Sequence, residues 1–243
     1  MGKLIQIDIP SGDALIHCEV SGPIEAPVVV FLHGNGEDLH IFDLQIKHFS
    51  TDYKVVAIDT RGHGLSTRGT GAFNFHTFAA DLLAVLDALH IDRAHIVGFS
   101  DGAIIALHTA LLAPERISSM VLLGVNYNPK GVKWIARIQI RLLYLLKRGK
   151  EREIWGLMVH HPHITISEIS TIQIPTLVVT GENDLVSQSQ NDEISLVIKN
   201  SRRIVVPKGD HFWMFAQPEL LNRYITDFLN GNIETESIQT LQS

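Results

Sequence analysis

The chain has 243 residues, of which 45% are hydrophobic and 19% are charged, and its formal net charge is -6. This length suffices for one large core, and the mild acidity gives no whole-chain reason to expect binding to nucleic acid or anionic membranes. Cys18 is the only cysteine, so no internal disulfide can form. The first ten residues lack a signal-peptide core and no run of about 18 apolar residues occurs, so we expect a cytoplasmic protein.

The first part of the chain predicts strands. Alternating apolar and polar residues over 4–9 and 14–20 predict an antiparallel hairpin at a sheet edge. Continuous apolar runs at 28–32 and 54–58 are typical of central parallel strands that are covered on both faces.

Helical patterns alternate with these strands, first over 38–49 and 75–89. Further strands are predicted at 94–97, 119–124, 177–180 and 203–206, and further helices at 103–108, 193–198 and 218–229. The alternation predicts an α/β fold with a mostly parallel, eight-stranded sheet that is flanked by helices.

Residues 127–171 interrupt the alternation, and we expect them to form a short helical lid. The lid divides one core into a first part, 1–126, and a second part, 172–230. The polar residues 231–243 are expected to form a flexible tail.

The predicted lid is amphipathic and basic. Five apolar residues fall on one helical face: Ile135, Ile138, Leu142, Leu145 and Leu146. Residues 130–153 hold eight Lys or Arg against two Glu, a local charge of +6. We expect the basic side to be solvated and the apolar side to cover the active site. An attraction to an anionic substrate or membrane surface is the alternative.

The residues Gly98-Phe99-Ser100-Asp101-Gly102 lie between a predicted strand and a predicted helix. This is the context of a nucleophile elbow, in which a glycine-framed turn raises a serine hydroxyl above the end of a strand. We therefore identify Ser100 as the candidate nucleophile. A chance occurrence of glycine, serine and glycine at this spacing is the alternative.

A serine nucleophile needs a base and an orienting carboxylate. Asp184 and His211 each follow a later predicted strand, in the chain order Ser, Asp, His that an elbow architecture requires. They are the candidate acid and base. Glu182 and Asp210 are nearby rivals for the acid, and a turn or cap role is the alternative for each aspartate.

The oxyanion of an acyl-transfer reaction also needs donors, each worth on the order of 3 kcal/mol. The residue after the nucleophile, Asp101, is expected to supply one backbone N–H. The second is expected from the loop His33-Gly34-Asn35-Gly36 that follows the strand 28–32. Asn35 is the preferred donor, with its neighbouring glycines as alternatives.

Together these motifs resemble the α/β-hydrolase superfamily over residues 4–230. The resemblance rests on 33–36, 59–66, 98–102, 181–184 and 209–211. The Asp-x-Arg-Gly-x-Gly-x-Ser stretch at 59–66 is similar to the lid-bearing branch that holds carboxylesterases, meta-cleavage product hydrolases and cofactor-free perhydrolases. Haloalkane dehalogenases and epoxide hydrolases share the stretch but use an aspartate nucleophile, which Ser100 does not match.

The elbow Gly-aromatic-Ser-Asp-Gly also resembles that of the valacyclovir hydrolases, in which the carboxylate after the nucleophile helps to bind the substrate's amino group. At Asp101 this resemblance implies an amino-ester substrate. Compensation of the helix dipole is the alternative role for this side chain.

We therefore expect a carboxylesterase-like serine hydrolase that cleaves a small ester through an acyl-enzyme, as a monomer or homodimer, with no nucleic-acid or membrane partner. The alternatives are a C–C bond hydrolase or perhydrolase with the same triad, or a non-catalytic ligand receptor on this scaffold. The expected substrate-binding residues are Trp134, Ile138, Leu142, Trp155 and Phe212.

No cofactor is expected. The histidines at 160, 161 and 163 lack the helical pair spacing and the further ligands of a metal site, so no metal is expected either.

Overall fold

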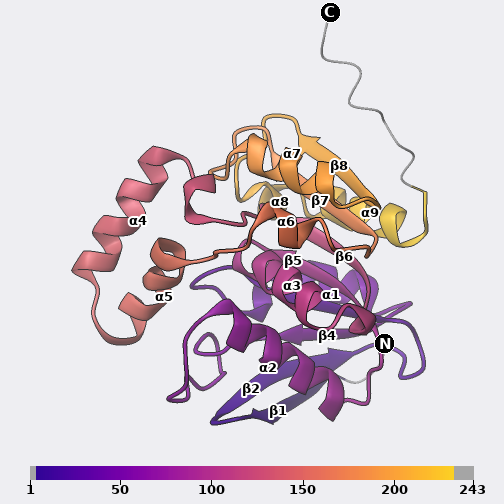
Figure 1. Ribbon diagram of the computed structural model, residues 1–243. Coiled ribbons are helices and arrows are strands. Elements are labelled where there is room, and N and C mark those ends of the chain that lie inside the picture. The colour runs from indigo at the N-terminus through magenta and orange to yellow at the C-terminus, as the bar shows by residue number, and fades with distance from the viewer. Residues whose placement is uncertain (1–3, 233–243) are drawn as a thin grey trace, which may run out of the picture.

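A computed structural model of the chain describes residues 4–232 (Figure 1). Eight strands form one sheet in the order β1-β2-β4-β3-β5-β6-β7-β8. The strands are β1 (Ile5–Ser11), β2 (Ala14–Ser21), β3 (Val28–Leu32), β4 (Lys54–Ile58), β5 (Ala94–Phe99), β6 (Ile117–Leu123), β7 (Thr176–Gly181) and β8 (Ser201–Val206). Pairing is antiparallel between β1 and β2 and between β2 and β4, and parallel between all other neighbours.

The predicted α/β fold and the mostly parallel eight-stranded sheet are confirmed, and each predicted strand begins and ends within two residues of the observed one. The β1–β2 hairpin forms the expected edge. The reason is the hydrophobic pattern, because period-two alternation and short continuous apolar runs specify half-buried and fully buried strands respectively.

Helices cover both faces of the sheet. The α-helices are α1 (Asp43–Phe49), α2 (Phe75–Ala88), α3 (Asp101–Leu112), α4 (Trp134–Leu146), α5 (Gly149–His160), α6 (Ile166–Ile169), α7 (Gln188–Val197), α8 (Trp213–Ala216) and α9 (Pro218–Leu229). Short 3-10 turns, η1 (Leu39–Phe42), η2 (Pro114–Arg116) and η3 (Pro129–Gly131), precede α1, β6 and α4.

Two buried apolar clusters lie on opposite faces of the sheet. One face packs against α2, α3, α6 and α7, through residues such as Leu82, Ile104 and Ile194. The other packs against α1, α8 and α9, through residues such as Phe49 and Ile225. The parallel strands are thus covered on both sides, which is what their continuous apolar runs require.

Residues 127–171 contain α4, α5 and α6. Figure 1 shows α4 and α5 extending to the left of the sheet, away from the helices that cover its two faces, whereas α6 lies back near α7. Of the predicted tail 231–243, residues 233–243 lie outside the described residues.

A buried ion pair fastens the loop after β4 to the edge of the sheet. Arg61 donates to both carboxylate oxygens of Asp81 in α2, at 2.8 and 2.6 Å, and to Asp13 at 2.8 Å. Ser11 also donates to Asp81, at 2.6 Å. Arg61 and Asp81 are both buried, so each charge depends on the other for compensation.

Candidate active site

Ser100 lies in the turn between β5 and α3 with φ 51° and ψ -111°, a conformation that is unfavourable for a residue with a side chain. A Cβ added at Gly98 would meet the backbone of Gly102, and one added at Gly102 would meet the carbonyl of Leu32 in β3. Only glycine therefore fits at positions 98 and 102, two residues before and two residues after Ser100. This is the geometry of a nucleophile elbow.

The ring of His211 lies between Ser100 and Asp184. Its Nε2 is 3.2 Å from the Ser100 Oγ, and its Nδ1 is 2.7 Å from the Asp184 Oδ1. A carboxylate can only accept, so Nδ1 carries the hydrogen and Nε2 is left to accept from the serine hydroxyl. The three predicted residues are brought together although Ser100 and His211 stand 111 positions apart.

Asp184 is buried and fixed by backbone donors. The N–H of Val186 donates to its Oδ1 at 2.9 Å. The rival acids point elsewhere, because the carboxylate of Glu182 accepts from the N–H of Lys208 and that of Asp210 accepts from the N–H of Phe212. Of the three acids considered from the sequence, Asp184 is therefore the one that contacts the histidine.

Asn35 lies beside the elbow, at the carboxyl end of β3. Its side-chain Nδ2 donates to the Asp101 carboxylate at 2.8 Å and to the carbonyl of Ile154 in α5 at 2.9 Å. Among residues 4–232, the backbone N–H groups of Asn35 and Asp101 donate to no protein acceptor. Both N–H groups are thus unpaired next to the serine.

A buried histidine holds the loop that carries Asn35. The N–H of Thr60 donates to the Nε2 of His33 at 2.9 Å, so the Nδ1 of His33 carries the hydrogen and donates to the carbonyl of Gly34 at 2.7 Å. Burial lowers the pKa of His33 to about 4, which keeps this ring neutral.

Glu37 was not singled out from the sequence, yet its side chain lines the cavity beside Ser100. Its carboxylate accepts the N–H of Gly34 at 2.9 Å. Burial raises the pKa of Glu37 to about 7, against the lowering effect of the Gly34 N–H and of His211. No motif marks this residue, and only its position three residues after Gly34 could have suggested it.

The Asp101 carboxylate is buried under Asn35. Burial raises the pKa of Asp101 to about 6, and the hydrogen bond from Asn35 partly opposes this shift. Asn35 and Glu37 line the cavity, whereas Asp101 does not. Of these two carboxylates, that of Glu37 is therefore the one that faces the cavity.

A cavity of about 240 Å³ opens at Ser100 between the core and the helical segment. Its lining is mainly apolar and comes from the end of β5, from α4 and α5, and from the segments that follow β3, β5, β7 and β8. The lining residues are Asn35, Glu37, Phe99, Ser100, Ala136, Gln139, Ile140, Leu143, Trp155, Met158, Leu185, His211 and Phe212. Trp155 and Phe212, two of the residues expected to bind substrate, are among these lining residues.

The expectation that Trp134, Ile138 and Leu142 line the pocket is wrong. These three side chains are each at least half exposed and lie outside the cavity. Helix α4 instead turns Ala136, Gln139, Ile140 and Leu143 inward, a face separated by half a turn from the predicted one. Periodicity identified the apolar stripe, but it could not identify which stripe faces the core.

Within residues 4–232, no group of three or more His, Cys, Asp or Glu side chains has an arrangement that could hold a metal ion. No helix in this part of the chain is long and apolar enough to cross a membrane.

Residues 27–149 match the family model for the alpha/beta hydrolase fold, which is half of the chain. The chain belongs to the α/β-hydrolase family. The match includes the loop with Asn35 and the elbow with Ser100. It ends before β7 and β8, whose following loops hold Asp184 and His211.

Relatives of this α/β hydrolase act on several kinds of bond. It is 25% identical to the carboxylesterase YbfK of Bacillus subtilis, over 90% of this chain and 85% of the relative. It is also 25% identical to the putative carbamate hydrolase RutD of Pseudomonas savastanoi, over 85% of this chain and 95% of the relative.

Among solved structures, Est816, an N-acyl homoserine lactone degrading enzyme, superimposes with a TM-score of 0.78 at 26% identity. The superposition covers 91% of this chain and all of that one. These similarities support a hydrolase, while the bonds that the relatives act on differ.

Proposed function

We propose that this α/β hydrolase is a carboxylesterase-like serine hydrolase that cleaves small esters through an acyl-enzyme. The observation that carries the proposal is the position of His211, whose two ring nitrogens contact Ser100 and Asp184. This arrangement couples removal of the serine proton to stabilisation of the imidazolium that results.

In the proposed reaction, the Oγ of Ser100 attacks the ester carbonyl carbon and its proton passes to the Nε2 of His211. Collapse of the tetrahedral intermediate breaks the ester C–O bond, and His211 returns the proton to the leaving alcohol. Water then loses a proton to His211 and attacks the acyl-serine. Collapse of this second intermediate breaks the bond between the acyl carbon and the Ser100 Oγ, and His211 returns the proton to the Oγ, which releases the acid and restores the hydroxyl.

The unpaired backbone N–H groups of Asn35 and Asp101 are the proposed donors to the oxyanion. They need no movement to act, because α3 and the His33-anchored loop hold them in place. The apolar cavity wall formed by Ile140, Leu143 and Met158 favours a short acyl group, and its volume of about 240 Å³ favours a small substrate.

The test is hydrolysis of p-nitrophenyl esters from acetate to octanoate, together with labelling by a fluorophosphonate. We expect wild type to hydrolyse the shorter esters and to be labelled, Ser100→Ala to lose both activities, and Ser189→Ala, at an exposed serine, to keep both.

Labelling without ester turnover would favour the C–C hydrolase or perhydrolase alternative, which product analysis would then identify. Absence of both labelling and turnover would contradict the serine hydrolase proposal and favour a ligand receptor.

A further inference from the structure

The outer face of α4 is an exposed apolar stripe. Its six residues are Trp134 (67% exposed), Ile135 (56%), Ile138 (50%), Leu142 (54%), Leu145 (68%) and Leu146 (76%). With 3.6 residues per turn, they fall within an arc of about 120° along the whole helix. We refer to this set as the α4 stripe. A continuous stripe of this kind on a surface helix usually marks an interaction site.

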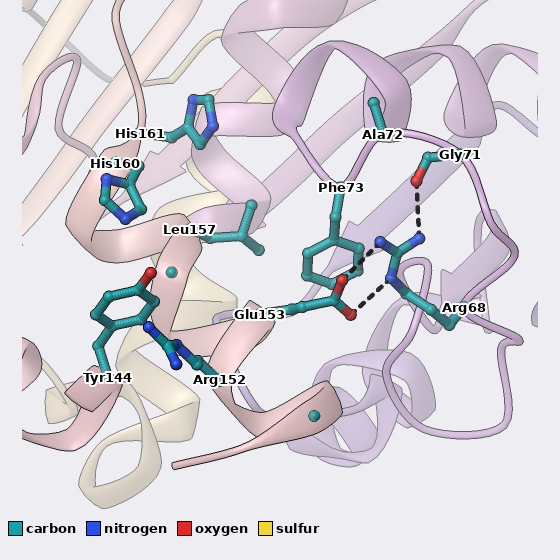
Figure 2. Close-up of a pocket in the computed structure, with 12 residues that line it drawn as sticks. Arg68, Gly71, Ala72, Phe73, Tyr144, Arg152, Glu153, Leu157, His160 and His161 are labelled. Carbon is teal, nitrogen blue, oxygen red and sulfur yellow. Dashed lines mark hydrogen bonds and ion pairs between the residues drawn. The ribbon is translucent and has the colours of Figure 1, made fainter. Parts of the chain in front are cut away.

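The opposite side of α4 is already occupied. Its Ile140 and Leu143 face the cavity, and Arg152 of α5 lies over the ring of Tyr144, 4.8 Å from its centroid. Figure 2 shows Arg152 beside Tyr144, and it shows Arg68 of the core bound to both carboxylate oxygens of Glu153, each at 2.9 Å. The helix pair is thus anchored on its inner side, and α4 cannot bury its stripe by rotating inward without breaking these contacts.

Basic side chains border the α4 stripe. Around the helix axis, Arg141 lies next to the edge of the stripe, and Arg137 lies beyond Arg141 on the side away from the stripe. Just beyond Leu146 the chain continues with Lys147, Arg148 and Lys150. Residues 130–153 carry a net charge of +6, although the whole chain carries -6.

These charges select the kind of partner. A second copy laid stripe to stripe would bring two basic sets together, whereas an anionic surface would attract this side of the molecule and repel the acidic remainder. An exposed apolar face that contains a tryptophan and leucines and is bordered by arginines is the composition of a helix that lies in a membrane interface.

We propose that the α4 stripe docks on membrane surfaces that carry anionic lipid headgroups. The helix lies in the interface with its apolar side chains among the headgroups and acyl chains, and the arginines and lysines contact lipid phosphates. The binding is peripheral, so it is compatible with the absence of a membrane-crossing helix from residues 4–232. It does not depend on the reaction at Ser100.

The test is flotation of the full chain with vesicles of phosphatidylcholine alone or with about one-third phosphatidylglycerol. Intrinsic tryptophan fluorescence, to which Trp134 contributes together with Trp155 and Trp213, is a second readout. We expect at least tenfold tighter binding to the anionic vesicles, a blue shift of the emission, and weaker binding at high salt. Ile138→Gln/Leu142→Gln/Leu145→Gln should weaken binding at least tenfold. The control Ile24→Gln/Leu65→Gln/Leu196→Gln changes three apolar residues elsewhere that are at least as exposed, and it should bind like wild type.

The charge contribution is tested with Arg137→Gln/Arg141→Gln, which should weaken binding to anionic vesicles more than Lys47→Gln/Lys199→Gln. Lys47 and Lys199 are exposed in α1 and in the turn after α7. Circular dichroism and thermal unfolding check that each variant is folded. Equal binding by the α4 and control variants would overturn the proposal, as would no binding by wild type. A concentration-dependent dimer that the α4 triple variant abolishes, without vesicle binding, would assign the stripe to a second copy of the chain instead.

Discussion

Gly124, the residue directly after β6, leaves the space that the ring of His211 occupies. A Cβ built on Gly124 would lie 2.7 Å from the Cε1 and 2.9 Å from the Nδ1 of His211. The same Cβ would lie 3.5 Å from the Oδ2 of Asp184. The ring thus has a backbone wall on one side, and on the other it packs against Phe99, with 4.9 Å between ring centroids. Its position between serine and aspartate depends on both.

Gly124→Ala should therefore displace the imidazole and lower kcat for ester hydrolysis by about 10- to 100-fold, because small misplacements of a catalytic group are costly. Position 124 also has a φ of 61°, so some loss of stability is expected from backbone strain alone. Gly12→Ala is the matched control, since Gly12 has a φ of 58° and no atom within 4 Å of an added Cβ. Equal kinetic effects of the two variants would contradict the role assigned to Gly124.

Asp184→Asn should reduce kcat/KM by about three to four orders of magnitude, because an amide in place of the carboxylate no longer stabilises the Nδ1-protonated imidazole. Glu182→Gln serves as the control, since the Glu182 carboxylate contacts the Lys208 N–H rather than the histidine. Steady-state kinetics on the best ester of the panel measures both. Comparable losses of kcat/KM in the two variants would contradict the assignment of Asp184 as the acid that orients His211.

Glu37 should make stability depend on pH. Its pKa is raised by burial from 4.5 to about 7, so the folded state holds the proton more tightly than the unfolded state. The contribution of the protonated Glu37 carboxyl to the free energy of unfolding is therefore full below about pH 4.5 and is lost as the pH rises through 7. Glu37→Gln lacks this loss, so the variant should gain up to about 3 kcal/mol relative to wild type between pH 4.5 and pH 8.

Urea unfolding of wild type and Glu37→Gln at the two pH values measures this difference. Glu25→Gln, at an exposed carboxylate that precedes β3 and does not line the cavity, is the control. A Glu37→Gln effect that is the same at both pH values would show that the carboxyl is not held in its protonated form.

The buried pair of Arg61 and Asp81 should be important for stability. Asp81→Asn leaves the buried guanidinium with only the half-exposed Asp13 as a charged partner, and we expect a loss of about 3–5 kcal/mol in unfolding free energy. Asp87→Asn breaks an exposed ion pair with Arg116 and should cost less than about 1 kcal/mol. Thermal and urea unfolding compare the two, and a similar small effect in both would contradict the argument.

The candidate site was predictable where local chain geometry determines it. The two glycines around Ser100 and the apolar strands before Asp184 and His211 are visible in the sequence, and parallel strands bring such loops to one edge of a sheet. Glu37 was missed because a carboxyl at the mouth of a cavity has no local signature. Its neighbour Gly34 is close in the sequence, but His211, whose charge also acts on it, comes from a distant part of the chain.

The sequence by itself determined the order of the strands and helices, the elbow, and the existence of an apolar stripe in the segment before β7, because these depend on periodicity and on local backbone sterics. Only the tertiary structure decided which side of α4 faces the cavity and which of three acids contacts His211. These depend on the rotation of a helix about its axis and on the direction of side chains in space. The apolar stripe of α4 that was predicted to face the cavity is the one that is exposed.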